Sequence, residues 1–316
     1  MEQPVLELQD LHTYFHTPAG LLKAVGGVSL TIQQGETLGL VGESGCGKST
    51  LGNTVMRMLR PTAGKVLFEG KDIWEYSRSE RKEYSRKVQM IFQDPYASLD
   101  PLNVVGDIIA EGMKVHHMYQ GKELENRVLE LMDMVSLNRQ YRNRFPYEFS
   151  GGQRQRIGIA RALSMNPRLI VCDEPISALD VSIQAQIVNL LRELQEQTGV
   201  SYLFITHDLS MCKYISDRIA VMYLGNIVEL AEAESLFAEP LHPYTQALMS
   251  AIPVADPREE AARRRIILQG DVPSPVNLKP GCPFAARCPQ ATERCYQEKP
   301  QLQEKASGHC VACHLV

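Results

Sequence analysis

Short apolar runs alternate with segments of helical spacing along the first 240 residues. Residues 5–9 and 28–33 alternate apolar and polar positions, which is typical of antiparallel strands with one solvent-exposed face. Short apolar runs predict further, more buried strands at residues 37–41, 66–68, 88–92, 169–172, 201–205 and 218–223. Strands that alternate with helical segments predict an α/β fold with a mostly parallel sheet and helices on its faces.

Helical spacing of apolar residues marks four segments between these strands. They are residues 48–59, 104–143, 152–165 and 181–198. The second and third belong to a helical insertion at about residues 94–165, which interrupts the alternation. We therefore expect the parallel sheet to carry a small antiparallel β subdomain and a helical insertion.

The composition changes after residue 238, where prolines become frequent enough to break any long helix. This change predicts a domain boundary near residue 240, with one domain at residues 1–240 and a loop-rich extension at residues 241–316. No run approaches the roughly 18 apolar residues of a membrane-spanning helix, and no secretion signal follows Met1. The net charge of −4 argues against a general nucleic-acid binder.

A glycine-rich stretch directly follows the predicted strand at residues 37–41. It reads Gly42, Glu43, Ser44, Gly45, Cys46, Gly47, Lys48, Ser49 and Thr50. Between a strand and a helix, this pattern predicts a phosphate loop whose backbone N–H groups hold the phosphates of a nucleotide. Lys48 then supplies a positive charge to the phosphates, and the Ser49 hydroxyl ligates Mg²⁺. A glycine-rich turn without a ligand is the alternative, and the complete pattern disfavours it.

Polar side chains follow three of the predicted strands. Asp173 ends the run at residues 169–172, and we expect it to hold Mg²⁺ through water; Glu174 is the candidate general base. Gln93 follows residues 88–92 and is expected to reach the metal or the attacking water. His207 follows residues 201–205 and is expected to contact the γ-phosphate. Each of these residues alone is typical of an ordinary strand end. Only their occurrence together, in this order along the chain, supports a nucleotide site.

A second glycine-rich helix start lies about a hundred residues after the phosphate loop. Ser150 is a natural N-cap, and Gly151, Gly152 and Gln153 open the helix. A helix N-terminus favours anions, so this stretch is a candidate phosphate site. A plain capped helix start is the competing interpretation.

Five of the eight cysteines crowd the end of the chain: Cys282, Cys288, Cys295, Cys310 and Cys313. Without a secretion signal, this pattern favours a metal or cluster site over a disulfide framework. Four thiolates suit an iron–sulfur cluster and zinc alike, and His309 or His314 could replace a sulfur on zinc. The wide spacings slightly favour the cluster, and free buried thiols are the alternative.

These motifs together resemble the ATP-binding subunits of ATP-binding-cassette (ABC) transporters over about residues 5–240. The resemblance rests on the phosphate loop, Gln93, Ser150–Gln153, Asp173–Glu174, Ser177–Asp180 and His207. It implies a P-loop NTPase fold that binds ATP and Mg²⁺, with Asp180 at the nucleotide site. It implies that an aromatic residue stacks on adenine: Phe15 fits best, with Tyr14 and His16 as alternatives. Phe149 stands where the family usually has Leu, so only packing should differ.

The family resemblance also implies that two subunits bind ATP head to tail, with the phosphate loop of one facing Ser150–Gln153 of the other. Residues 241–245 and 269–275 and the cysteine tail look like the extension of oligopeptide and dipeptide importer ATPases. This implies short peptides as the solute, with nickel or another small solute as the alternative. Family members carry a [4Fe-4S] cluster in this tail, which implies Cys282, Cys288, Cys295 and Cys313 as ligands, with Cys310 left out.

The resemblance further implies a location and partners. We expect a peripheral protein on the cytoplasmic face of the inner membrane, with a homologous second ATP-binding subunit and two transmembrane permease subunits. A separate extracytoplasmic binding protein would select the solute. A competing hypothesis from a different functional class is a soluble ABC ATPase that acts on nucleic acid or ribosomes. Those proteins carry tandem cassettes, coiled-coil insertions or basic arms, and this chain shows none in its sequence.

Overall fold

The computed structural model describes residues 3–252, 265–270 and 272–316. Pro253, Pro257 and Asp271 of the proline-rich region lie outside the described residues. The chain folds into two compact units. The first is built from Met1–Glu7, Thr31–Thr37 and Leu67–Ile205, and the second from Leu8–Leu30, Leu38–Val66 and Thr206–Val316.

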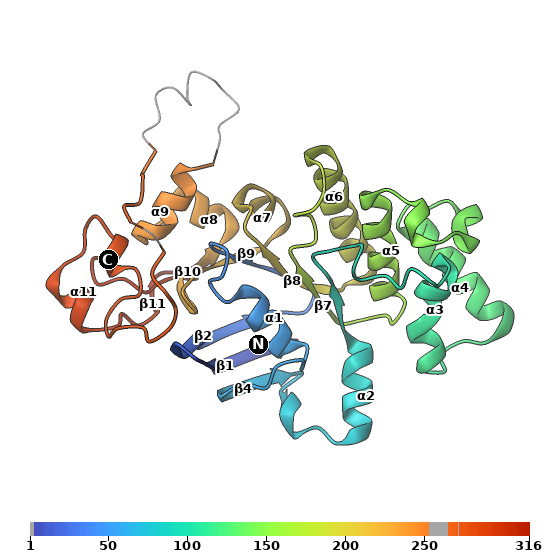
Figure 1. Cartoon of the computed structure of the whole chain (residues 1–316), viewed down its shortest axis with the longest axis horizontal. Helices are drawn as coiled ribbons and strands as arrows, with labels where there is room; N and C mark the ends of the chain where they lie inside the picture. Colours follow the sequence, from blue (N-terminus) through green and yellow to red (C-terminus); the bar gives the residue numbers. More distant parts are fainter. Residues whose placement is uncertain (1–2, 253–264, 271) are drawn as a thin grey trace. The chain divides into compact units, whose positions relative to one another are not determined.

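The first unit contains three parallel strands and a group of helices. In chain order its elements are β5 (Lys71–Asp72), η1 (Ile73–Glu75), α2 (Arg78–Lys87), β6 (Val88–Ile91), α3 (Val105–Val115), α4 (Gly121–Met134), η2 (Arg139–Asn143), η3 (Pro146–Glu148), α5 (Gly151–Leu163), β7 (Leu169–Asp173), α6 (Val181–Thr198) and β8 (Ser201–Thr206). Strands β6, β7 and β8 pair in that order, with Val88 opposite Leu169 and Leu169 opposite Ser201. Helices α3, α4 and α5 pack on one another (Figure 1).

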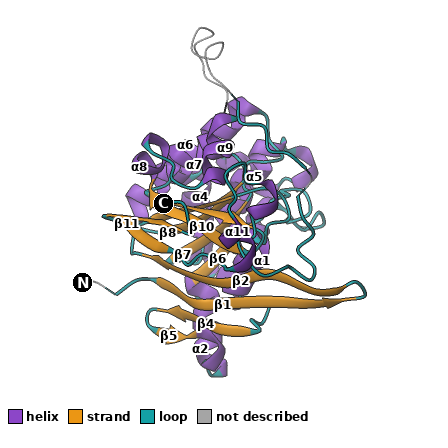
Figure 2. Cartoon of the chain, turned by 90° about the vertical axis from the view of Figure 1, so that its left-hand side faces the viewer, coloured by secondary structure: helices purple, strands orange, loops and turns teal. Residues whose placement is uncertain are grey.

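The second unit contains the strand that precedes the phosphate loop and the whole C-terminal tail. Its elements are β1 (Leu6–Thr17), β2 (Gly20–Ile32), β3 (Thr37–Val41), α1 (Lys48–Val55), β4 (Ala63–Phe68), α7 (Leu209–Ile215), β9 (Arg218–Tyr223), β10 (Asn226–Glu232), α8 (Ala233–Ala238), α9 (Pro243–Ser250), η4 (Ala285–Arg287), α11 (Glu293–Gln297), β11 (Gln303–Ala306) and β12 (His309–Val311). Strands β2, β1 and β4 lie side by side (Figure 2).

Strands β3, β9, β10, β12 and β11 are neighbours in the second unit, in that order. β3 and β9 are parallel, whereas β10 is antiparallel to both β9 and β12. Glu229 of β10 is opposite Val311 of β12, so the end of the tail extends the same sheet. An apolar cluster that includes Val221, Leu236 and Phe284 fills the space beside these strands.

The predicted α/β class with parallel and antiparallel strands is confirmed. The strand at 37–41, the helix at 181–198 and the strand at 218–223 have the predicted bounds. The helix predicted at 48–59 ends at Val55, because the backbone turns left-handed at Arg57 (φ 59°). Among the residues that the structure describes, no helix has the length and apolar character needed to cross a bilayer.

Candidate functional site

The glycine-rich stretch after β3 forms a compact loop in the second unit. Gly47 has a left-handed φ of 108°, and a Cβ there would lie 2.0 Å from the Ala24 carbonyl oxygen. Only glycine tolerates this backbone and this close approach. The Lys48 ammonium is almost fully buried, and it donates to the Gly42 carbonyl (2.8 Å) and the Glu43 carbonyl (3.1 Å). The loop therefore encloses a positive charge directly at the N-terminus of α1.

The carboxyl ends of the parallel strands in the first unit bring two predicted site residues together. The Gln93 Nε2 atom donates to the Glu174 Oε2 atom at 3.0 Å. Asp173 is the last residue of β7 and is buried, with 8% of its surface exposed. Since β6 and β7 pair in parallel, the residues that follow them meet at one edge of the sheet.

The backbone of Glu174 has an unusual conformation that no local sequence pattern predicts. Its φ is 47°, in the left-handed region that a residue other than Gly, Asn or Asp rarely adopts. Its N–H donates to the Ile205 carbonyl of β8 at 2.9 Å, which holds this turn in place. Strain of this kind is found at functional sites, where the surroundings fix a side chain in one direction.

The second glycine-rich helix start is the N-terminus of α5. Ser150 Oγ accepts from the Gln153 N–H (3.3 Å), and Gln153 Oε1 accepts from the Ser150 N–H (3.1 Å). This reciprocal capping box leaves the N–H groups of Gly151 and Gly152 at the positive end of the helix dipole. Asp180 occupies the N-cap position of α6 in the same unit, and its side chain makes no capping hydrogen bond.

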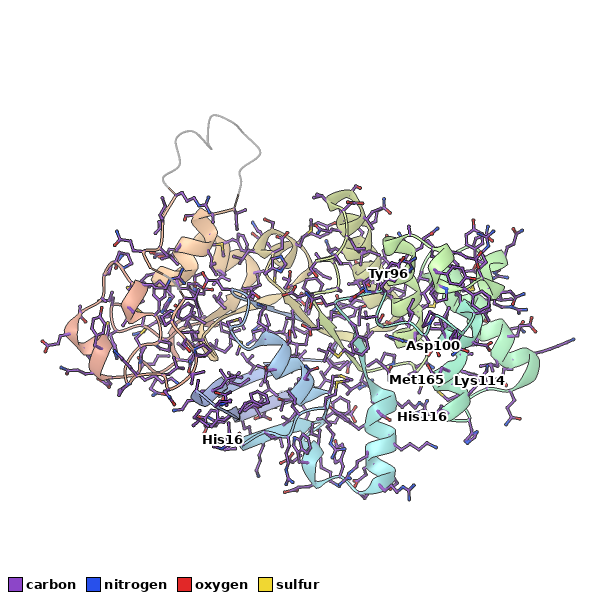
Figure 3. The ribbon with its side chains drawn as sticks, in the orientation of Figure 1. His16, Tyr96, Asp100, Lys114, His116 and Met165 are labelled. Atoms are coloured by element: carbon purple, nitrogen blue, oxygen red, sulfur yellow. The ribbon has the colours of Figure 1, made fainter. Side chains whose placement is uncertain are left out.

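Two further predicted residues lie in or next to strands. His207 is exposed and directly follows β8. Phe15 is half-buried on β1, and successive side chains of a strand point to opposite faces. Tyr14 and His16 therefore share the face opposite Phe15; His16 is labelled in Figure 3. The Tyr14 hydroxyl is hydrogen bonded to His12 Nδ1 at 2.7 Å. Phe15 as the adenine-stacking residue stays a prediction.

The tail cysteines fall into two groups by their electrostatic surroundings. Burial raises the pKa of Cys282 to about 11, and Cys295, Cys313 and Cys288 add to the rise. The pKa of Cys310 is raised by burial and by Glu304, and no other cysteine contributes. The pKa of Cys282 thus depends on three other cysteines of the tail, whereas the pKa of Cys310 depends on none. Even so, no set of three or more His, Cys, Asp or Glu side chains arranged to hold a metal ion occurs in the described part of the chain.

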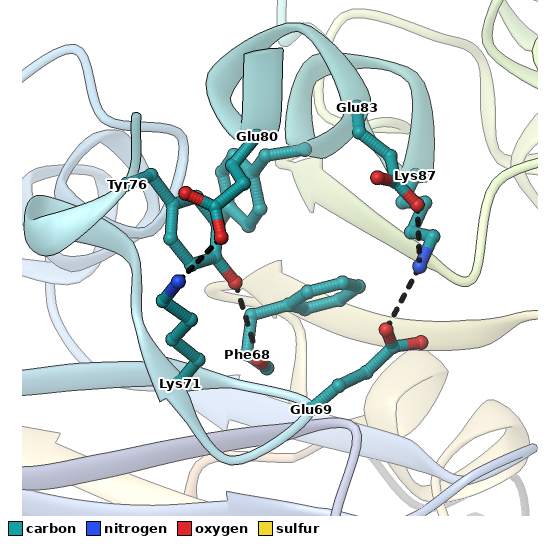
Figure 4. Close-up of a pocket in the computed structure, with 8 residues that line it drawn as sticks. Phe68, Glu69, Lys71, Tyr76, Glu80, Glu83 and Lys87 are labelled. Carbon is teal, nitrogen blue, oxygen red and sulfur yellow. Dashed lines mark hydrogen bonds and ion pairs between the residues drawn. The ribbon is translucent and has the colours of Figure 1, made fainter. Parts of the chain in front are cut away.

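One surface pocket of the first unit contains none of the predicted site residues. It is lined by Phe68, Glu69, Lys71, Tyr76, Glu80, Glu83, Tyr84 and Lys87, from the end of β4 to α2 (Figure 4). Its rim consists of the ion pairs Lys71–Glu80 and Lys87–Glu69. These paired charges attach α2 to the β4–β5 turn, which is a structural role.

Several contacts near the predicted residues have no signal in the sequence. The Arg154 guanidinium on α5 is buried, donates to the Pro146 carbonyl at 2.7 Å and lies 3.4 Å from the ring centroid of Tyr96. Tyr96, labelled in Figure 3, belongs to the loop that follows Gln93. Arg154 thus ties this loop to the glycine-rich helix start. Phe149 is buried against Tyr141, with 5.8 Å between the ring centroids.

Two known protein families match different segments of the chain. Residues 25–177 match the family described as "ABC transporter". Residues 228–295 match "Oligopeptide/dipeptide transporter, C-terminal region". The first match contains the phosphate loop and Glu174, and the second contains Cys282, Cys288 and Cys295.

Curated relatives and solved structures agree with these matches. The chain is 55% identical over 314 residues to the putative oligopeptide transport ATP-binding protein YkfD of Bacillus subtilis, which covers 99% of this chain and 95% of the relative. It is 51% identical to the oligopeptide transport ATP-binding protein AppF of the same organism, over 99% of this chain and 98% of the relative.

A solved ATP-binding cassette, MJ0796, in a dimeric post-hydrolysis state with ADP and Pi, covers 72% of this chain and 98% of its own, with a TM-score of 0.66 and 29% identity. The cbiO1 protein of Clostridium perfringens, part of an ABC transporter complex, covers 75% of this chain and 92% of its own, with a TM-score of 0.67 and 28% identity. The chain is therefore an ATPase and belongs to the ABC transporter family, among the ATP-binding proteins that carry the oligopeptide/dipeptide transporter C-terminal region.

Proposed function

We propose that this chain is the ATP-hydrolysing motor subunit of a membrane importer for dipeptides and oligopeptides. The observation that carries the proposal is the pairing of an ABC cassette at residues 25–177 with the oligopeptide/dipeptide region at residues 228–295. Relatives named as oligopeptide transport ATP-binding proteins match over nearly the whole chain. In this proposal residues 1–240 are the cassette and residues 241–316 are the extension.

The residues divide the chemistry of hydrolysis between them. Lys48 and the N–H groups of Ser44–Thr50 bind the phosphates and cost little reorganisation, because the loop already holds them in place. Ser49 and Gln93 are the proposed oxygen ligands of Mg²⁺, and Asp173 would hold the ion through water; the bound metal would neutralise developing charge. Glu174 accepts the proton of the attacking water, and its bond to Gln93 fixes the direction of the carboxylate. His207 contacts the γ-phosphate, and Phe15 stacks on adenine.

A second ATP-binding subunit completes the site in this proposal. The N-terminus of α5, which begins at Gly151 after the Ser150 N-cap, offers the positive end of a helix dipole to the phosphates of a nucleotide on the partner subunit. Two solved structures of the MJ0796 cassette are dimeric, one of them in a post-hydrolysis state bound to ADP and Pi. We propose a homologous partner cassette, with two permease subunits that anchor both cassettes at the cytoplasmic face of the membrane. A solute-binding protein outside would act only indirectly.

The cysteine tail is proposed to carry a [4Fe-4S] cluster on Cys282, Cys288, Cys295 and Cys313. The chemistry of the donors fits, because cysteine thiolates are the usual ligands of such clusters; Cys295 is buried and the other three are partly buried. In the described residues they are not yet arranged as a group that could hold a metal. The cluster would cross-link a tail that contains little regular structure; zinc on the same thiols is the alternative.

Extraction of a tagged chain from membranes in a mild detergent tests the proposed complex. We expect a second ATPase and two membrane proteins to co-purify, and the ATPase rate of the complex to rise when a peptide-loaded binding protein is added. Recovery of the chain alone, or stimulation by a nickel-loaded binding protein and not by peptide, would contradict the proposal.

The variant Gly151→Asp should assemble normally but lower ATP hydrolysis, because it adds a negative charge to the anion site.

A further inference from the structure

The tail reaches the phosphate loop at one residue, Glu43. The Arg287 Nη1 atom lies 2.9 Å and 3.2 Å from the two carboxylate oxygens of Glu43. The Arg287 side chain is 9% exposed and that of Glu43 is 26% exposed, so water screens this ion pair only in part. Glu43 is the second residue of the loop, directly after Gly42.

The backbone of Glu43 is held from two further sides. Its N–H donates to the Tyr244 hydroxyl at 3.0 Å, and its carbonyl accepts from the Lys48 ammonium at 3.1 Å. One residue of the loop thus joins Lys48 to two side chains from beyond residue 240. The Glu43 carbonyl also accepts from the Cys46 N–H at 3.3 Å. Within the first half of the loop, Glu43 is therefore the point at which contacts from the C-terminal extension act.

Tyr244 and Arg287 are themselves fixed by a packed aromatic group. The Tyr244 ring is fully buried and lies 4.7 Å from the Tyr223 ring and 5.4 Å from the Phe284 ring, measured between centroids. Phe284 precedes η4, whose last residue is Arg287. A side chain that is locked by packing holds its hydrogen-bond partner with little loss of entropy on binding.

We propose that Arg287 and Tyr244 are positioning residues that pre-form the phosphate loop through Glu43, so that the C-terminal extension sets the affinity of this chain for ATP. The proposal rests on the proposed role of the loop in holding the ATP phosphates. A purely structural role is the alternative, in which the ion pair attaches the tail and has no effect on nucleotide affinity. The two differ in what they predict for KM.

Steady-state ATP hydrolysis by the full chain in its transporter complex separates them. Arg287→Ala should raise the KM for ATP about tenfold, equivalent to about 1.4 kcal/mol, while kcat changes less than about twofold, because lost pre-organisation weakens ground and transition states equally. Arg287→Lys keeps the charge and should recover most of the affinity. Glu43→Gln, which preserves the shape of the side chain, should raise KM as Arg287→Ala does. The double variant should be no worse than either single one, because both remove the same contact.

Two control variants make the outcome specific. Arg294→Ala removes an exposed arginine of the same tail, paired with Glu298, and should leave KM unchanged. Lys48→Ala should abolish ATP binding; if it binds ATP normally, the phosphate-loop assignment itself is wrong. If Lys48→Ala loses ATP while Arg287→Ala and Glu43→Gln keep the wild-type KM, only the positioning role is overturned. A lower unfolding temperature with unchanged KM, or additive effects in the double variant, would also overturn it.

Discussion

At the scale of single residues, the proposed chemistry of the first unit is concentrated after β6 and β7, where Gln93 Nε2 donates to Glu174 Oε2 at 3.0 Å. A carboxylate after a buried strand is a local signal, so Asp173, Glu174 and Gln93 could be predicted. The left-handed φ of Glu174 and the Arg287–Glu43 pair could not, because one depends on tertiary packing and the other joins residues 244 positions apart. The choice of Cys313 over Cys310 as a cluster ligand rests on the family resemblance and stays a prediction.

Glu174→Gln tests the proposed base. The amide keeps the shape of the side chain and its bond to Gln93, but it cannot accept a proton. We expect ATP hydrolysis to fall by at least about 100-fold, the usual contribution of a general base, while ATP binding is retained. The matched control is Glu196→Gln, an exposed carboxylate on α6. A Glu174→Gln variant with normal turnover would assign the proton transfer to another group.

His242 predicts how stability depends on pH. Its ring is buried, and its Nδ1 atom accepts from the Tyr244 N–H at the start of α9. Burial lowers the pKa of His242 from 6.5 to about 4. The unfolded chain therefore binds a proton between these values and the folded chain does not, so the free energy of unfolding falls as pH drops from about 6.5 to about 4, by up to about 3 kcal/mol.

Chemical unfolding across this pH range measures the effect. His242→Asn keeps a hydrogen-bond acceptor at the N-cap and removes the titrating group. The unfolding free energy of this variant should therefore depend less on pH between about 4 and about 6.5 than that of the wild type. Equal pH slopes for the wild type and the variant would show that His242 contributes nothing.

At the scale of elements, the periodicity of apolar residues predicts the bounds of some helices and strands but not of others. The helix α6 and the strands β3 and β9 have a clear pattern and match the predicted bounds. The helix α2 was missed because it is almost entirely polar, and its capping box at Ser77 and Glu80 was the one local signal for it. The pairing of β12 with β10 brings together segments about 80 residues apart, which no local pattern encodes.

The attachment of β12 can be tested at a buried ion pair. His309 Nε2 lies 2.7 Å from Glu229 Oε1, and the Glu229 side chain is fully buried. The carboxylate also accepts from the N–H groups of Leu241 and His242. His309→Ala leaves the buried Glu229 carboxyl group without its imidazole partner, so the free energy of unfolding should drop by about 3 kcal/mol.

Guanidinium unfolding checks this value, and Arg294→Ala serves as the matched control because it removes an exposed pair of the same tail. The control should leave the unfolding midpoint nearly unchanged. If His309→Ala does the same, β12 is held by its backbone pairing and apolar contacts alone.

At the scale of the whole molecule, the fold class and the family were accessible from the sequence because the motifs are ordered and far apart. The order and spacing of these motifs along the chain identify the fold, which no single motif does.

The metal content of the cysteine tail is tested separately. Anaerobic purification of the full chain should give a brown protein with about four irons per chain, and the variant Cys310→Ser should keep them. A colourless protein that contains zinc would overturn the cluster and retain the metal site.

The central claim is that this chain converts ATP hydrolysis into peptide uptake. The most direct test is the accumulation of a radiolabelled short peptide by proteoliposomes that contain the purified complex, the binding protein and ATP on the cassette side. The account predicts ATP-dependent accumulation with the wild-type chain and almost none with Glu174→Gln, although the variant complex assembles. Uptake that is independent of ATP, or equal in the variant, would contradict it.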